Sequence, residues 1–138
     1  MTAAKREALR MMFGGRCAYC GCELTGKWQK DHIKPLVRFT EYGTTGNDGH
    51  YVRHEKPVRR LERPENDCAE NLYPACRACN INKSSRSVEQ YRKFLLDGPE
   101  SLASYNGRFR HMLRFGIVAV NKEPFQFWFE RYRQEQAV

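Results

Sequence analysis

Four of the six cysteines in this chain form two Cys-x-x-Cys pairs, Cys17 with Cys20 and Cys76 with Cys79. Thiolates spaced in this way are typical ligands of a structural zinc ion, which four of them can enclose in a tetrahedron. The chain opens without a charged-then-apolar leader, so metal binding explains the pairs better than disulfides do. We therefore predict one structural zinc per chain, held by these four sulfurs.

Three polar residues lie next to this predicted metal clip in the sequence. Asp31 and His32 stand between the two pairs, and Asn80 directly follows Cys79. A zinc ion that closed the pairs would bring these three side chains together beside the metal. A carboxylate, an imidazole and an amide oxygen held on a rigid frame are the groups of a metal-assisted hydrolase.

Metal-assisted hydrolysis needs an activated water, stabilisation of the charge that develops in the reaction and help for the leaving group. Histidine, whose ordinary pKa is about 6.5, is a natural base at neutral pH. One hard cation that touches the substrate can supply the other two functions.

Short elements must position these residues. Apolar spacing and capping residues predict helices over residues 2–13, 75–83 and 87–96, the last of them broken by Asp97-Gly98-Pro99. A strand is expected over 28–33, ended by Pro35. Residues 38–69 lack clear periodicity and indicate a long loop with at most a short hairpin over 51–61.

The C-terminal part is rich in aromatic residues. An apolar helical stripe covers 102–112, with a turn-like interruption at Asn106-Gly107. Aromatic residues over 125–132 fit both helical and strand spacing. We interpret both aromatic stripes as core packing rather than as platforms for stacking bases.

The chain resembles the HNH endonucleases, whose nuclease core is the zinc-clipped ββα-metal motif. The resemblance covers about residues 14–96, with the long loop inserted, and leaves the terminal segments uncovered. Its motifs are Cys17-x-x-Cys20-Gly21, Asp31-His32-x-x-Pro35, Glu70-Asn71-Leu72 and Cys76-x-x-Cys79-Asn80-x-x-Lys83. The resemblance implies an α+β fold with a small zinc-stapled, treble-clef-like core and flanking helices, similar to the small free-standing members found in bacteriophages.

The resemblance also implies a role for each catalytic residue. His32 corresponds to the general base, Asp31 and Asn80 to the ligands of the catalytic cation, and Asn71 to the residue that braces the backbone and orients the base. Asn80 stands where many members have histidine. Two oxygen ligands favour Mg²⁺ or Mn²⁺ over softer ions.

The remaining basic residues, cysteines and histidines have simpler predicted roles. Lys34, Arg77 and Lys83 are predicted to contact DNA, although an exposed lysine without a partner is an alternative for Lys83. Cys22 and Cys68 are expected to be buried free thiols outside the zinc shell. The remaining histidines are expected to be ordinary surface or loop residues: His50, His54 and His111.

The net charge of +8 is unevenly distributed. Residues 1–37 carry seven Lys/Arg against three Asp/Glu, and residues 77–138 carry eleven against six. Residues 38–76, in contrast, carry six against seven. A basic excess beside the predicted site is expected of a surface that meets a polyanion.

These features together predict a metal-dependent DNA endonuclease that leaves 5′-phosphate and 3′-hydroxyl ends. We expect a single domain over 1–138, with its core at 14–96, the inserted loop at 38–69 and a helical extension at 97–138. No apolar stretch is long enough for a membrane span, so we expect a soluble, cytoplasmic protein, in the host cell if phage-encoded. DNA is the expected partner, and a homodimer or other protein partners remain open.

Two alternatives are also open. One is a zinc-clipped DNA- or RNA-binding module without catalysis, which would have no reason to hold Asp31, His32, Asn71 and Asn80 together. The other is a small redox protein, which needs only one Cys-x-x-Cys pair and a βαβ context that this sequence lacks. Base readout is expected from 38–69 or from the C-terminal segment.

Overall fold

The computed structural model describes all 138 residues as a mixed α+β fold with five α-helices and two separate two-stranded antiparallel sheets. One sheet pairs β1 (Gln29–His32) with β4 (Leu72–Ala75), and the other pairs β2 (Val37–Thr45) with β3 (Tyr51–Glu62). The helices are α1 (Ala3–Met11), α2 (Arg77–Lys83), α3 (Val88–Tyr105), α4 (Gly107–Arg114) and α5 (Trp128–Gln136). None of them combines the length and the apolar character needed to cross a bilayer.

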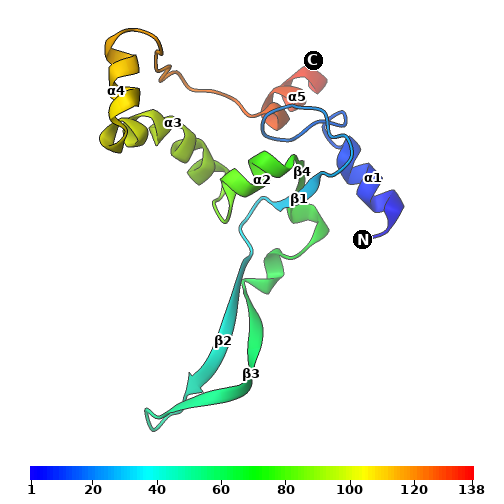
Figure 1. Ribbon diagram of the computed structural model, residues 1–138. Coiled ribbons are helices and arrows are strands. Elements are labelled where there is room, and N and C mark those ends of the chain that lie inside the picture. The colour runs from blue at the N-terminus through cyan, green and yellow to red at the C-terminus, as the bar shows by residue number, and fades with distance from the viewer.

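The small β1–β4 sheet lies among helices, whereas the β2–β3 pair projects away from them as a long ribbon (Figure 1). Two 3-10 turns, η1 (Pro64–Asn66) and η2 (Ala69–Asn71), return the chain from the ribbon to β4. Strand β4 then leads directly into α2. The order β1, β4, α2 thus places residues 29–32 beside residues 72–83, although the ribbon separates them in the sequence.

The turn that carries the first cysteine pair is held by backbone hydrogen bonds. The amide of Cys17 donates to the carbonyl of Cys22 at 2.8 Å, and that of Gly21 donates to Cys17 at 3.0 Å. Gly21 adopts a φ of 75°, a left-handed conformation that glycine tolerates best. The turn therefore directs both sulfurs of the pair toward the start of α2.

Aromatic side chains form much of the core. Phe13 meets Tyr73 edge-to-face with ring centroids 5.1 Å apart, and Tyr19 meets Phe127 at 5.3 Å. Phe129 is also buried, at 5.0 Å from Tyr73. The prediction that the aromatic stripe over 125–132 packs in the core is confirmed for Phe127 and Phe129. The same prediction for the stripe over 102–112 is wrong, because it lies outside the core cluster and Tyr105 is 73% exposed.

The C-terminal segment is tied to the cysteine turn by its backbone. The amide of Phe129 donates to the carbonyl of Ala18 at 2.8 Å, and that of Trp128 donates to Tyr19 at 3.0 Å. The Trp128 indole donates to the carbonyl of Phe13 at 3.1 Å. Helix α5 therefore closes the core next to α1, and the two termini lie on the same side of the molecule (Figure 1).

Two further sequence-based expectations are wrong. Residues 38–69 are mostly not a loop, because β2 and β3 form an antiparallel ribbon that is interrupted by an irregularity between Glu41 and Gly43. Both faces of this ribbon are largely exposed, so its sequence lacks the apolar–polar alternation that marks a half-buried strand. Helix α3 does not end at Asp97 but continues through Pro99 to Tyr105. Proline there removes one backbone donor, a loss that a long, partly exposed helix tolerates.

Candidate functional site

The sulfurs of Cys17, Cys20, Cys76 and Cys79 all lie within 4.8 Å of one another. We call this group the four-cysteine cluster. A tetrahedral zinc ion with Zn–S distances of about 2.3 Å requires sulfurs about 3.8 Å apart, and the Sγ atoms of Cys20 and Cys76 are 3.9 Å apart. The residues therefore fit a zinc ion, and the predicted four-cysteine site is confirmed as a group that could hold a metal.

Hydrogen bonding within the four-cysteine cluster shifts the pKa values of its thiols. The bond with the Cys79 thiol is the largest cause that lowers the pKa of Cys17, and the same bond raises the pKa of Cys79. The Cys79 thiol thus stabilises a thiolate on Cys17, and the thiolate is the form of cysteine that binds zinc.

Asp31 lies in a buried network beside this cluster. Its Oδ2 accepts hydrogen bonds from the Tyr19 hydroxyl and, at 3.0 Å, from the ammonium of Lys83. The side chains of Lys83 and Asp31 are 0% and 4% exposed. Burial is the largest influence on Asp31 and raises its pKa, which the Tyr19 and Lys83 contacts lower in part.

Lys83 also fixes the end of β1. Its ammonium donates to the carbonyl of His32 at 2.7 Å. The prediction that Lys83 contacts DNA is therefore wrong, because its charged group is enclosed and already bound to Asp31 and to the backbone. A lysine in the last turn of a short helix normally reaches solvent, but here α2 directs it beneath β1.

His32 lies next to Asp31 on β1 but is reachable from solvent. Its side chain keeps 19% exposure, and its Nε2 lies 3.3 Å from Oδ1 of Asp67. A hydrogen on Nε2 that is donated to Asp67 leaves Nδ1 as the unprotonated ring nitrogen. The imidazole can then accept a proton.

Asn71 braces the chain that follows His32. Its side-chain oxygen accepts from the amide of Lys34 at 2.8 Å, and its side-chain nitrogen donates to the carbonyls of Lys34 at 2.9 Å and Asn66 at 2.8 Å. The amide of Ile33 donates to the Asn71 carbonyl at 2.9 Å. Asn71 thus locks the turn after β1 against the return from the ribbon.

Asn80 faces the same region from α2. Its side-chain nitrogen donates to Gln29, and its side-chain oxygen has no hydrogen bond to protein. The second oxygen of Asp31 likewise accepts no protein hydrogen bond, yet no buried polar side-chain atom lacks a partner. Both oxygens are therefore accessible from solvent.

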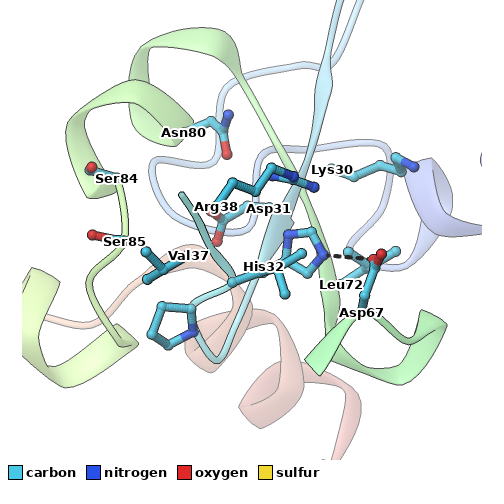
Figure 2. Close-up of a pocket in the computed structure, with 12 residues that line it drawn as sticks. Lys30, Asp31, His32, Val37, Arg38, Asp67, Leu72, Asn80, Ser84 and Ser85 are labelled. Atoms are coloured by element: carbon cyan, nitrogen blue, oxygen red, sulfur yellow. Dashed lines mark hydrogen bonds and ion pairs between the residues drawn. The ribbon is translucent and has the colours of Figure 1, made fainter. Parts of the chain in front are cut away.

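Asp31, His32 and Asn80 line one open cleft of about 690 Å³. Figure 2 shows His32 with its contact to Asp67 on one side, Asn80 across from it, and Asp31 and Arg38 between them. Ser84 and Ser85 lie along the edge of the same cleft (Figure 2). The full lining is Lys30, Asp31, His32, Pro35, Leu36, Val37, Arg38, Asp67, Leu72, Asn80, Ser84 and Ser85.

Two of the residues predicted to contact DNA, Lys34 and Arg77, are exposed but do not line the cleft. Lys30 and Arg38 line it instead. Of these two, Arg38 comes from the ribbon, so its place at the cleft depends on pairing that the sequence pattern does not reveal.

The two cysteines left out of the zinc shell remain outside the four-cysteine cluster. Cys22 and Cys68 are exposed rather than buried, so this expectation is wrong. Cys22 follows the Gly21 turn, where its thiol lies beside those of Cys20 and Cys76, and Cys68 lies between η1 and η2.

Sequence reasoning missed three functional contacts of the cleft: Asp67 to His32, Tyr19 to Asp31 and Gln29 to Asn80. Gln29 had a signal, since it lies two residues before Asp31 on the predicted strand. Tyr19 lies between the two cysteines of the first Cys-x-x-Cys pair, and this spacing predicts metal ligands but not a role for the residues between them. For Asp67 the sequence carries no signal, because the ribbon separates it from His32.

Comparisons with protein-family models, with curated proteins and with solved structures find no match to this chain. An assignment of function therefore depends on the cleft and the four-cysteine cluster themselves.

Proposed function

We propose that this chain is a metal-dependent DNA endonuclease of the HNH type, in which β1, β4 and α2 form a treble-clef-like ββα-metal core around a structural zinc. One observation carries the proposal: His32, Asp31 and Asn80 meet at a single open cleft beside the four-cysteine cluster. A buried carboxylate and a solvent-accessible imidazole in one cleft are expected of a hydrolytic site.

In this proposal His32 is the general base. Asp67 accepts the hydrogen of Nε2, so Nδ1 takes the proton from the attacking water. Asn71 keeps the ring in place because it fixes the backbone of Lys34 immediately after β1. The ring would thus be oriented by its contact with Asp67, and the backbone that follows it by Asn71.

The free oxygens of Asp31 and Asn80 would hold the catalytic cation. Mg²⁺ or Mn²⁺, when bound there, supplies Lewis-acid stabilisation of charge on the phosphate and on the leaving oxygen. Lys83 neutralises part of the Asp31 charge. We therefore expect weak cation binding in the absence of DNA, whose phosphate would complete the ligand set.

Basic side chains at the cleft would hold the DNA strand. Lys30 and Arg38 line the cleft and form no ion pair with a carboxylate, so their charges are available to phosphates. Phosphate contacts of this kind position the scissile bond but read no sequence.

A zinc-clipped nucleic-acid-binding module is the second candidate. The pairing of Asp31 with Lys83 favours it, because one carboxylate oxygen is already occupied by protein donors. The two candidates differ in whether the cleft cuts DNA.

Supercoiled plasmid incubated with the purified protein and Mg²⁺ separates them. The endonuclease proposal predicts nicked or linear plasmid, no product when EDTA replaces free Mg²⁺, and nicks that DNA ligase reseals, because ligase requires 5′-phosphate and 3′-hydroxyl ends. Intact plasmid in both Mg²⁺ and Mn²⁺, together with a shifted band from DNA binding, would overturn the endonuclease and favour the binding module.

A further inference from the structure

Neither face of the β2–β3 ribbon is covered by another part of the protein; both are largely exposed. Its strands pair only with each other, and the ribbon extends away from the rest of the molecule (Figure 1). The nine residues of β2, at about 3.4 Å each, give it a reach of about 30 Å. Such an exposed, protruding element requires a functional explanation.

The inner half of the ribbon has one basic face. Arg38 pairs with Leu61 and Thr40 pairs with Arg59, and directly paired residues of an antiparallel sheet point to the same side. This face therefore carries the side chains of Arg38 and Arg59 and no carboxylate. Neither guanidinium forms an ion pair within the protein, in contrast to Arg60.

The opposite face neutralises its own charge. Glu41 accepts from His54 at 2.7 Å and from Arg60 at 3.4 Å. Their contacts lower the pKa of Glu41, with the His54 hydrogen bond as the largest cause. In this half of the ribbon the two faces thus differ: Arg60 is paired with Glu41, whereas Arg38 and Arg59 are unpaired.

The basic face continues into the candidate active site. Arg38 lines the catalytic cleft together with Asp31, His32 and Asn80, and it also lines a second groove of about 410 Å³ with Arg59 on the ribbon. Figure 2 shows Arg38 extending over the cleft near Asp31. A phosphate chain that enters the cleft would therefore meet the ribbon next.

The ribbon also carries exposed aromatic side chains. Phe39, Tyr42 and Tyr51 are 47%, 56% and 61% exposed. Aromatic and arginine side chains on one protruding element suit contact with sugars, thymine methyl groups and base edges. A two-stranded ribbon also fits the major groove, which is about 12 Å wide.

We propose that the ribbon docks in the major groove of duplex DNA next to the scissile phosphate, with Arg38 and Arg59 on the phosphates of the groove wall. The inference rests on the proposed function and names its substrate class: double-stranded rather than single-stranded DNA. The outer half of the ribbon, beyond Glu41, then reaches the base edges.

The test measures DNA affinity with cleavage removed. In full-length protein carrying His32→Ala, the double substitution Arg38→Ala/Arg59→Ala is compared with Arg108→Ala/Arg114→Ala on α4, which removes the same charge from exposed residues distant from the ribbon (Figure 1). We expect the ribbon variant to lose affinity for a short duplex on the order of tenfold, and its salt slope to fall by about 2. The α4 variant should retain both. Equal effects of the two variants would overturn the proposal.

Footprinting identifies the groove. Dimethyl sulfate methylates guanine N7 in the major groove and adenine N3 in the minor groove. The His32→Ala protein should protect guanine N7, and the ribbon substitutions should remove that protection. Protection of adenine N3 alone, or equal affinity for single strands, would contradict the proposal. So would a dimer that the ribbon substitutions convert to monomer without loss of DNA affinity, since the ribbon would then bind a second copy.

Plasmid cleavage and duplex binding test the nuclease and the ribbon separately. A wild-type protein that never cuts plasmid but needs Arg38 and Arg59 for duplex binding would refute the nuclease and support the ribbon. A protein that cuts plasmid and binds duplex equally well without these arginines would support the nuclease and refute the ribbon.

Discussion

In the core around the four-cysteine cluster, every buried polar side-chain atom has a protein partner, whereas on the β2–β3 ribbon both faces meet water. Asp31, Lys83 and Tyr19 satisfy one another beneath β1, but Arg38 and Arg59 have no carboxylate partner. The contrast fits the proposed function, in which the core would supply stability and geometry and the ribbon would contact the substrate. The candidate active site lies where the two regions join.

Loss of zinc binding by the four-cysteine cluster should lower the stability of the protein more than any other change considered. Cys76→Ser retains an oxygen that can cap α2 where the Cys76 sulfur now accepts from Cys79, so its effect reports the metal rather than the cap. Binding of structural zinc contributes on the order of 10–16 kcal/mol to such folds. We expect Cys76→Ser to lose zinc in elemental analysis and to lack a cooperative thermal transition.

Cys68→Ser is the matched control, since Cys68 is exposed and lies outside the four-cysteine cluster. It should keep one zinc per chain and the wild-type melting temperature. Full zinc content and normal melting in Cys76→Ser would refute the assignment of stability to the clip.

Removal of the buried ammonium of Lys83 should give the next largest loss in the free energy of unfolding. Lys83→Met keeps the length of the side chain but leaves the Asp31 carboxylate buried without its charge partner. Breaking a buried pair in this way costs about 3–5 kcal/mol, which urea unfolding can measure. Lys93→Met, which breaks the exposed pair with Asp97, should cost little by comparison, because solvent screens a surface ion pair. Similar losses in both variants would show that Lys83 is not a core residue.

A change at the cleft should alter metal preference more than stability. Asn80→His places an imidazole beside Asp31, and imidazole shifts preference from Mg²⁺ toward Ni²⁺ or Co²⁺. We expect the ratio of cleavage rates in Ni²⁺ and Mg²⁺ to rise by roughly tenfold, about 1.4 kcal/mol. Asn82→His, on an exposed position of the same helix, should leave the ratio unchanged. An identical ranking of metals in both variants would argue against Asn80 as a ligand.

Shortening the ribbon should change stability least. Replacing residues 44–52 with Asn-Gly joins the paired residues Gly43 and Arg53 through a turn that suits a hairpin. Because the ribbon packs on no other sheet, the free energy of unfolding should change by less than about 0.5 kcal/mol, while duplex affinity falls. A large loss of stability would show that the ribbon, like the core, stabilises the fold.

The sequence predicts the core better than the ribbon, for physical reasons. Cysteine spacing restricts where a metal can bind, so the pattern of residue types alone groups Cys17, Cys20, Cys76 and Cys79. The β1 strand, α2 and the break at Asn106 also lie where expected. Such local signals depend on ligand spacing, capping residues and helical periodicity.

Long-range contacts and doubly exposed strands carry no comparable signal. The ribbon lacks a buried face, so its strands show no alternation. The burial of Lys83 depends on the angle at which α2 crosses β1, and the Asp67–His32 contact depends on how the chain returns from the ribbon. Each of these follows from tertiary placement rather than from residue type.

The rate of plasmid cleavage by His32→Ala, under single-turnover conditions in Mg²⁺, tests the central claim most directly. A general base contributes typically about 10²–10⁴-fold, so we predict at least this loss, with zinc content and duplex affinity unchanged. His111→Ala, on α4 and remote from the cleft, should cut at the wild-type rate. Cleavage by His32→Ala at the wild-type rate would contradict the account.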